Sequence, residues 1–237
     1  MEGSTRITLP PDEAHHLKHV LRLGVGAEVA VFDGRGREWA ARAISLGKAR
    51  DVTVELLEEI APVAEPPVRV TLGIGVLKGD QMDAVVRDVT ALGVAEIVPV
   101  ASEHVSVPSR AWRSGAASAR WQRIAVAAAK QCGRAVVPEL KPVARLPALL
   151  EQADVDARLM SVEPKVAASR ELALGSLNRP STALALVGPE GGWANGELDL
   201  AVRRGVTLVH LGPRTLRAET APTVLLSSLW TVWGWSA

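Results

Sequence analysis

The strongest constraint in the sequence is an alternation of strand-like and helix-like segments that begins at residue 68. Near-continuous apolar runs, typical of buried strands, occupy residues 68–76, 95–100, 157–162, 182–187 and 206–211. Helix-like stretches follow them at 80–92, 112–131, 146–153, 195–204 and 220–233. Strands of this kind form parallel sheets whose two faces are covered by helices. The sequence therefore predicts an α/β domain over residues 67–237.

The first 66 residues follow a different pattern and are predicted to form a separate, smaller domain. Alternating apolar and polar residues, typical of half-buried strands, occur at 28–32, 38–44 and 52–56. A helical stretch at 11–23 precedes these strands, and a proline-rich linker follows at 61–67. The pattern predicts a small β-barrel, an architecture that often holds RNA.

The composition excludes several classes of protein. The single cysteine, Cys132, rules out a disulfide framework and a thiolate metal cluster. His15, His16 and His19 lie close together, but no nearby acid or cysteine completes a tetrahedral set, so we expect no metal. No apolar run approaches the roughly 20 residues that span a bilayer. We therefore expect a cytoplasmic protein without a membrane segment.

Charge is balanced over the whole chain but concentrated locally. The chain has 27 Lys and Arg residues against 26 Asp and Glu residues. Residues 102–145 carry eight basic side chains against two acidic ones. Such a block can bind an anionic partner such as nucleic acid, because the electrostatic field near the block matters more than the net charge of the whole chain. A solvated helix face is the alternative, and the charges alone leave both interpretations open.

Two glycine-containing loops follow predicted strands, at the edge of the sheet where α/β proteins bind ligands. Residues 186–193 read LVGPEGGW, and residues 211–220 read LGPRTLRAET. Neither matches a phosphate-binding P-loop, and Glu190 would repel a phosphate. A ligand with a purine, a ribose and a cationic centre fits better, and S-adenosylmethionine has all three. The first loop taken alone is equally consistent with a plain turn.

The second loop concentrates charged residues. Arg214, Arg217 and Glu219 lie within six residues, directly before a predicted helix. An ion pair between neighbours is the ordinary interpretation, because structural ion pairs often resemble sites. Two arginines and one acid beside a glycine loop at a strand end favour a binding site. We expect the two glycine loops to lie at neighbouring strand ends and to share one ligand.

These loops and several upstream segments resemble the ribosomal RNA small subunit methyltransferase E family. The similarity includes HLKHVLRLGVG at 16–26 and DGRG at 33–36, and it extends in order over nearly the whole chain. The resemblance implies a SPOUT-class α/β domain with a C-terminal deep trefoil knot, and an N-terminal PUA-like β-barrel. It also implies S-adenosylmethionine-dependent methylation of N3 of one uridine in 16S ribosomal RNA, near the decoding region. The implied assembly is a homodimer through the knot region.

Site residues follow from the same resemblance and from the charge pattern. Cofactor contacts are expected from Leu186, Gly188, Pro189, Gly191, Leu211, Gly212, Leu216 and Arg217. Arg217 is expected to stabilise the uridine anion, and Glu219 to orient Arg217 or to accept a proton through water. RNA contacts are expected from Lys18, Arg22, Arg35, Arg110, Arg120, Arg123 and Arg134. Departures from the usual family pattern at Trp193, Thr215 and Ala218 leave Arg217 and Glu219 intact.

Two other functions stay open on the sequence. The first is a methyltransferase of the same class that acts on the ribose 2′-hydroxyl of tRNA or rRNA. The predicted barrel and the 211–221 sequence argue against it. The second is a non-catalytic RNA-binding protein that retains the fold, which would have no need to bind S-adenosylmethionine.

Overall fold

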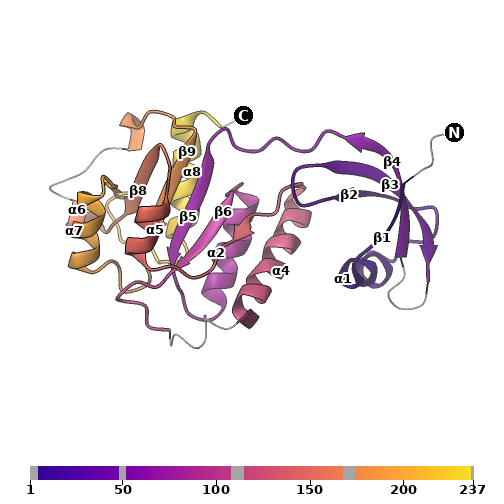
Figure 1. Cartoon of the computed structure of the whole chain (residues 1–237), viewed down its shortest axis with the longest axis horizontal. Coiled ribbons are helices and arrows are strands. Elements are labelled where there is room, and N and C mark those ends of the chain that lie inside the picture. The colour runs from indigo at the N-terminus through magenta and orange to yellow at the C-terminus, as the bar shows by residue number, and fades with distance from the viewer. Residues whose placement is uncertain (1–4, 48–51, 108–114, 168–173, 236–237) are drawn as a thin grey trace. The chain divides into compact units, whose positions relative to one another are not determined.

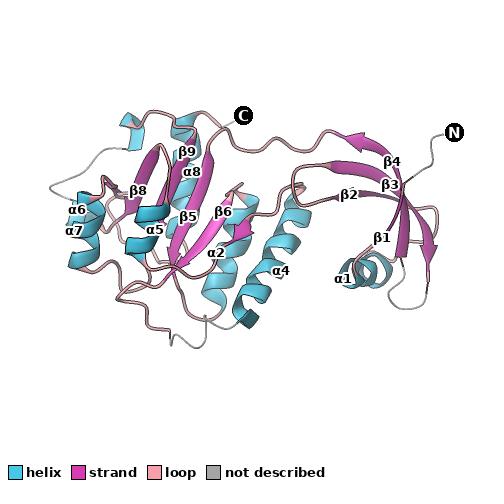
Figure 2. Cartoon of the chain, in the orientation of Figure 1, coloured by secondary structure: helices cyan, strands magenta, loops and turns pink. Residues whose placement is uncertain are grey.

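A computed structural model describes residues 5–47, 52–107, 115–167 and 174–235 (Figures 1 and 2). The chain divides into two units. The N-terminal unit comprises residues 1–63 and 133–136, and the α/β unit comprises residues 64–132 and 137–237. The sequence pattern gives no sign that residues 133–136 belong with the N-terminal unit.

An antiparallel sheet forms the N-terminal unit, as the alternating pattern predicts. The strand order is β1-β4-β3-β2. The bounds are β1 Arg6–Thr8, β2 Glu28–Phe32, β3 Glu38–Leu46 and β4 Val52–Ile60. Two register shifts between β3 and β4 mark bulges, which bend a sheet and increase its twist. Strand β1 was not predicted, because three residues are too few to show an alternation of apolar and polar side chains.

The predicted N-terminal helical stretch consists of two short pieces. Helix α1 spans Pro11–His15, and a π-helical turn continues it over His16–Val20. Ala14 and Leu17 are buried in the same cluster as Val54 of β4, so the helical pieces cover this sheet. The 133–136 segment joins the unit through the Gly36 N–H, which donates to the Ala135 carbonyl at 3.1 Å.

All strand pairs of the second sheet are parallel, which confirms the α/β prediction. The order is β10-β8-β9-β5-β6-β7. The strands are β5 Arg69–Gly75, β6 Glu96–Val100, β7 Glu139–Leu140, β8 Ala157–Ser161, β9 Thr182–Val187 and β10 Thr207–Val209. The helices are α2 Asp80–Ala91, α4 Gly115–Cys132, α5 Leu146–Gln152, α6 Pro164–Ala167, α7 Asn195–Arg203 and α8 Ala221–Trp233. The two-residue strand β7 and the short α6 were not predicted.

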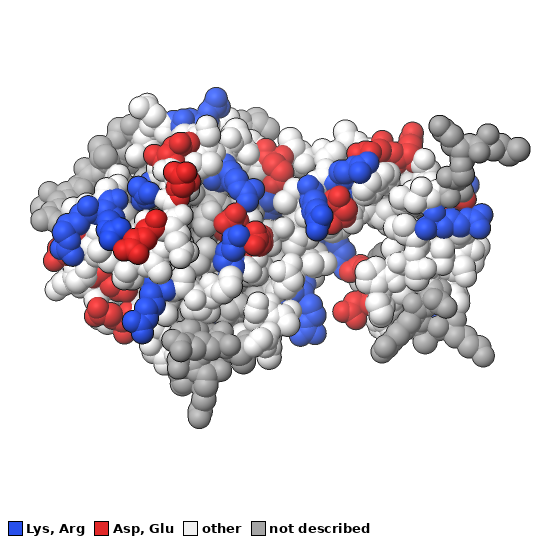
Figure 3. All heavy atoms as spheres, in the orientation of Figure 1, with Lys and Arg blue, Asp and Glu red and all other residues white. Residues whose placement is uncertain are grey.

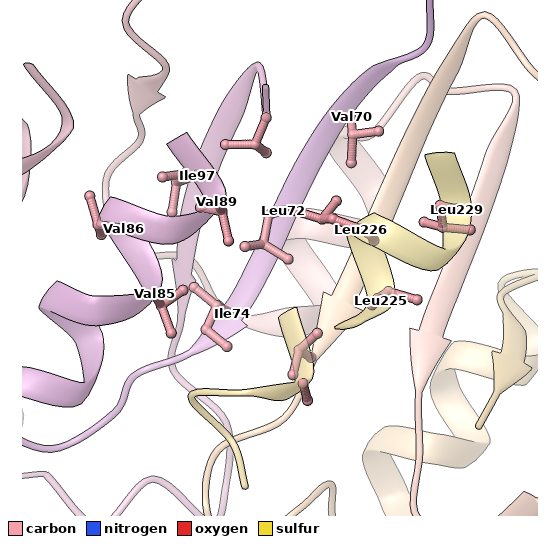
Figure 4. Packing of buried hydrophobic residues seen from close by; sticks show 14 of the residues in the cluster. Val70, Leu72, Ile74, Val85, Val86, Val89, Ile97, Leu225, Leu226 and Leu229 are labelled. Atoms are coloured by element: carbon pink, nitrogen blue, oxygen red, sulfur yellow. The ribbon is translucent and has the colours of Figure 1, made fainter. Parts of the chain in front are cut away.

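Helices cover both faces of this sheet and bury two separate clusters. One cluster joins one face of β5 with α2, α4 and α8. Figure 4 shows this packing for Val70, Leu72, Ile74, Val85, Val86, Val89, Ile97, Leu225, Leu226 and Leu229. The other cluster joins the opposite face with α5 and α7, through Leu149 and Leu198 among others. This double coverage explains why the strand sequences are apolar throughout rather than alternating.

Gly73 lets the second cluster approach β5 closely. A Cβ at this position would lie 2.5 Å from the Leu186 Cδ2 atom and 3.0 Å from the Leu149 Cδ2 atom. Any larger residue would push these side chains away from the sheet, at a cost of about 1–3 kcal/mol. The centre of the sheet therefore depends on one small residue in β5.

Helices α2 and α7 begin at the predicted residues 80 and 195. Asp80 and Asn195 fit the residue types preferred at N-caps, but each is the first residue inside its helix. Gly79, with φ +53°, holds the cap position of α2. At α7, Ala194 holds the cap position, and its N–H donates to the Glu197 carboxylate at 3.0 Å. Glu197 thus supplies the capping acceptor from inside the helix.

Candidate active site

A cavity of about 460 Å³ lies at the carboxyl ends of β8, β9 and β10. Its walls come from segments 161–166, 187–193 and 211–219, and Gln81 of α2 contributes at one side. This is the edge of a parallel sheet where ligands bind, and the volume suits a small organic ligand. Both glycine loops line this one cavity, as predicted.

The prediction that these loops follow neighbouring strands is wrong. Strand β8 lies between β9 and β10, so the segment after β8 forms a third wall. Val162 and Glu163 of that segment line the cavity together with Ser161, the last residue of β8, and none of the three was predicted. The signal in the sequence is weak, because a single acid after an apolar run resembles an ordinary strand end. Only the order of strands in the sheet brings Glu163 to the site.

Most of the predicted cofactor residues line the cavity. Six of the eight do so: Gly188, Pro189, Gly191, Leu211, Leu216 and Arg217. Leu186 is fully buried in the cluster beneath α5 and α7. Gly212 lies beside Leu211 with φ +97°, a conformation that favours glycine, and is not among the lining residues.

The first glycine loop, residues 188–193, is held by contacts on several sides. The Lys78 N–H donates to the Glu190 Oε1 atom at 3.2 Å. The Trp193 Nε1–H donates to the Ser161 carbonyl at 3.2 Å. A Cβ on Gly75 would lie 2.5 Å from the Pro189 backbone nitrogen, so β5 and this loop are packed backbone to backbone. The first glycine loop is therefore shaped in advance of any ligand.

The second glycine loop, residues 211–219, presents its charges to solvent. The Arg217 guanidinium is 84% exposed and lies 3.8 Å from the Glu219 carboxylate, which is 23% exposed. An exposed ion pair at this distance contributes little to stability. The Arg217 carbonyl accepts the N–H groups of Thr220 and Ala221, both at 3.0 Å, so its backbone begins α8. The side chain is thus anchored at its base while its charged end is available.

The cavity lining suits a ligand with a positive centre and a flat apolar part. Three acidic residues, Glu163, Glu190 and Glu219, and two arginines, Arg214 and Arg217, line the cavity. This balance favours a cation over a phosphate. Apolar side chains also line the cavity, including Val162, Leu198, Leu211 and Leu216. A Cβ on Gly188 would lie 3.2 Å from the Trp193 Nε1 atom, a tight contact that the indole would have to relieve by a small shift.

The seven residues predicted to contact RNA lie in different settings. In the N-terminal unit, Arg22 and Arg35 are exposed, and Arg22 has the unusual φ of +52°. Lys18 donates to the Gly47 carbonyl at 2.9 Å. Arg134 is only 5% exposed, because the 133–136 segment packs into the N-terminal unit.

The other three, like Arg134, belong to the basic block of residues 102–145. Arg123 of α4 is exposed, Arg120 of α4 pairs with Asp83 of α2, and Arg110 lies outside the described residues. On the face that Figure 3 shows, basic and acidic side chains are interspersed over the described part of the α/β unit. The basic block in the sequence is therefore partly paired.

Two further observations concern metals and membranes. The rings of His15 and His19 lie 4.6 Å apart. Among the described residues, no three His, Cys, Asp or Glu side chains gather closely enough to bind a metal ion. No helix in the described ranges is long and apolar enough to cross a membrane.

The chain matches known protein families over both of its units. Residues 64–230 match the family described as the RNA methyltransferase domain, and residues 9–57 match the RNA methyltransferase PUA domain. The chain is 33% identical to the ribosomal RNA small subunit methyltransferase E of Synechocystis over 94% of this chain and 72% of that protein. The chain belongs to the ribosomal RNA small subunit methyltransferase E family. The Bacillus subtilis member is 27% identical and covers 97% of this chain and 91% of its own length.

Solved structures of methyltransferases share the whole fold. The Neisseria gonorrhoeae member of the ribosomal RNA small subunit methyltransferase E family, crystallised with S-adenosyl methionine, has a TM-score of 0.87 and 33% identity. It covers 98% of this chain and 94% of its own. A methyltransferase of Legionella pneumophila, also with bound S-adenosylmethionine, has a TM-score of 0.89 and 27% identity, with coverage of 98% and 93%.

Proposed function

We propose that this protein transfers a methyl group from S-adenosylmethionine to N3 of one uridine in 16S ribosomal RNA. The observation that carries the proposal is the meeting of two chemically different loops in one cavity. The first glycine loop shapes a wall for the methyl donor, and the second places the Arg217 guanidinium beside it. Family membership supports ribosomal RNA as the substrate.

The cofactor is held by residues of all three walls in this proposal. The apolar side chains of Leu211 and Leu216 pack against the adenine, and the glycines of the first loop let the backbone approach it. Glu163 and Glu190 favour a ligand with a positive centre. When bound, S-adenosylmethionine supplies an electrophilic methyl group on a sulfonium. The relatives crystallised with this molecule support the assignment.

Arg217 acts on the target base rather than on the donor. Uracil N3 carries a proton near neutral pH, and methylation requires its loss. A guanidinium held near the base stabilises the negative charge that develops on the ring. Glu219, at 3.8 Å, orients that guanidinium. Because N3 lies on the Watson–Crick edge, the uridine must be unpaired or flipped out when it reacts.

Binding of the RNA backbone is assigned to exposed basic residues. Arg22 and Arg35 in the PUA-like N-terminal unit and Arg123 on α4 are the exposed members of the predicted set. Phosphate contacts of this kind weaken steeply as salt concentration rises. The proposal therefore includes a strong salt dependence of RNA affinity and a cytoplasmic location, where the ribosomal subunits are.

Three architectural features complete the proposal: closure of the N-terminal sheet into a barrel, a trefoil knot near the C-terminus, and a homodimer. The knot would form where the chain passes from residues 211–220 into α8. Helix α8, which would be the threaded helix, buries Leu225, Leu226 and Leu229 in the central cluster. Sedimentation at micromolar concentration tests the dimer directly, and a sharp monomer boundary contradicts it.

The decisive experiment uses the purified protein with small ribosomal subunits from a strain in which its gene is deleted. After incubation with S-adenosylmethionine, the RNA is digested to nucleosides and analysed by mass spectrometry. We expect 3-methyluridine from one site in 16S RNA. A 2′-O-methylated nucleoside instead would assign the alternative ribose chemistry. Absence of any cofactor binding in calorimetry would assign a non-catalytic RNA-binding protein.

A further inference from the structure

We infer that His104 accepts the proton from uridine N3, and that the buried Glu197 positions the loop that carries it. This inference rests on the proposed N3 methylation and names the base that the reaction needs. His104 lies in the loop that follows β6, residues 101–107, and none of the predicted site residues lies in this loop. The inference depends on four hydrogen bonds that join this loop, the first glycine loop with the following Ala194, and α7.

The loop after β6 packs directly on the cavity wall. The His104 Nδ1 atom lies 2.9 Å from the Gly191 carbonyl oxygen. A Cβ on Gly191 would lie 2.9 Å from the His104 Cβ atom, so the two backbones can approach this closely only because residue 191 is glycine. Gly191 lines the cavity, and His104 is exposed beside it. The imidazole is therefore hydrogen-bonded to a residue of the cavity wall, although His104 is not itself among the lining residues.

This contact fixes the tautomer of the neutral ring. A carbonyl oxygen can only accept a hydrogen bond, so Nδ1 must carry the hydrogen. The Nε2 atom of the neutral imidazole then has a free lone pair and is an acceptor. Uracil presents N3–H as a donor on its Watson–Crick edge, which matches this acceptor. The Gly191 carbonyl thus prepares His104 for the one base atom that must lose a proton.

Glu197 holds the loop in place from below. Its carboxylate is buried, with 8% of the residue exposed. Oε2 accepts the Ser102 hydroxyl at 3.1 Å and the Ala194 N–H at 3.0 Å, and Oε1 accepts the Glu103 N–H at 3.2 Å. One buried charge therefore joins the loop after β6 to the end of the first glycine loop. A buried carboxylate is costly unless its partners are precisely placed, so this group fixes geometry more than it adds stability.

The proton transfer is balanced within the named groups. The N3–H bond breaks, its electron pair stays on N3, and the proton forms a new bond to the His104 Nε2 atom. The resulting imidazolium releases the proton to water after the methyl group has reached N3. Arg217 stabilises the anionic ring meanwhile, so the two residues serve opposite needs: one removes the proton and the other stabilises the charge left behind.

Paired substitutions at His104 separate a base from a structural anchor. In His104→Asn the amide nitrogen can still donate to the Gly191 carbonyl, but nothing replaces Nε2. We expect this variant to lower kcat by about 100-fold or more on small subunits from the deletion strain, with affinity for S-adenosylmethionine within about threefold. Added imidazole is expected to restore part of the rate. An Asn variant with wild-type kcat, or one with an equal loss of cofactor affinity, overturns the inference.

A second readout does not depend on activity. Two-bond ¹⁵N–¹H spectra of the wild-type protein, assigned by the signal missing from His104→Asn, report which ring nitrogen carries the hydrogen. We expect protonation at Nδ1 in the neutral ring. Protonation at Nε2 overturns the inference, because that nitrogen would then be a donor.

Glu197→Gln tests the positioning role. The side-chain carbonyl of the glutamine can still accept the Ala194 N–H and cap α7. Its NH₂ group is a donor and cannot accept the Glu103 N–H, so that hydrogen bond is lost. We expect kcat of Glu197→Gln to fall by about tenfold, while its affinity for the cofactor stays within about threefold of wild type. In Ser102→Ala we expect kcat to fall by a smaller factor. Equal losses of kcat and cofactor affinity would show a general structural role and overturn the assignment. If wild-type protein makes no 3-methyluridine, the proposed function fails; if it does and His104→Asn matches it, only this inference fails.

Discussion

The two glycine loops of the cavity both follow strands of the same sheet, but the rest of the protein holds them to different degrees. The first, 188–193, is hydrogen-bonded to the segments that follow β5 and β6 and to the end of β8, through Glu190, Gly191 and Trp193. The second, 211–219, extends the charged end of Arg217 into solvent. A glycine loop at a strand end therefore does not have one role: here one loop is a fixed wall and the other carries a charge outward.

This difference corresponds to two requirements of methyl transfer. Alignment of donor and acceptor needs a wall that does not move when the donor binds. Recognition of a nucleotide within a ribosomal subunit needs side chains that can be reached from outside. The comparison of the two loops is therefore testable, because substitutions in each should affect different measured quantities.

Arg217→Ala is expected to give the largest effect. Loss of the guanidinium should lower kcat by about 100-fold or more, because the charge on the ring is then unsupported. Cofactor affinity by calorimetry should stay within about threefold. Arg217→Lys, which keeps the charge but not the planar fork, should recover part of the rate. Full activity of the alanine variant would remove Arg217 from the reaction.

Gly75→Ala is expected to damage the first loop and spare the chemistry of the second. The new Cβ would lie 2.5 Å from the Pro189 backbone nitrogen, so the loop must move away from β5. We expect a Tm lower by about 5 °C and roughly tenfold weaker cofactor binding. The matched control is Gly196→Ala in α7, where no atom lies within 4 Å of the added carbon. Equal changes in Tm and cofactor affinity in the two variants would show that the first glycine loop is not tightly packed against β5.

Trp193→Phe tests one hydrogen bond of the fixed wall. The ring volume is largely kept, while the bond from Nε1 to the Ser161 carbonyl is lost. The expected cost is about 1 kcal/mol of stability and a two- to fivefold loss of cofactor affinity, with kcat at saturation almost unchanged. A drop in kcat without a change in affinity would contradict the division of labour between the loops.

Asp156→Asn concerns the opposite end of the same sheet and should have the smallest effect. The N–H groups of Thr182 and Ser181 donate to this carboxylate and hold its pKa below the ordinary value. A lowered pKa in the folded state stabilises the protein above about pH 4, and this contribution is lost as the pH falls through the folded-state pKa.

The Asn variant should therefore melt about 1–2 °C below wild type at pH 7, and the difference should shrink below pH 3. Thermal melts over pH 2.5–7 measure this. Cofactor affinity at pH 7 should not change, because Asp156 lies at the amino end of the strands. A constant difference in Tm at all pH values would show that the charge has no part in the effect.

Local sequence patterns were sufficient for most elements, because strand and helix periodicities survive wherever a segment is long and buried. Strand β9 and helix α8 lie within one residue of their predicted bounds. The patterns could not reveal that β8 lies between β9 and β10, since strand order depends on how the connections cross the sheet. Glu163 was missed for this reason.

Contacts between segments that are distant in the sequence explain the other residues whose surroundings were not predicted. Arg134 was expected at the surface with the other basic residues. It is buried, because the 133–136 segment to which it belongs packs into the N-terminal unit. His104 and Glu197 are 93 residues apart in the sequence, and nothing in either local segment indicates that both adjoin the first glycine loop. Contacts of this range are visible only in three dimensions.

A crystal structure with S-adenosylhomocysteine tests the central claim most directly. The account predicts that the ligand lies in the cavity between segments 161–166, 187–193 and 211–219, and that the backbone of 188–193 keeps its ligand-free conformation. Any movement should be confined to 211–219. A ligand bound elsewhere, or a first loop that rebuilds itself around the ligand while the second stays fixed, would contradict the account.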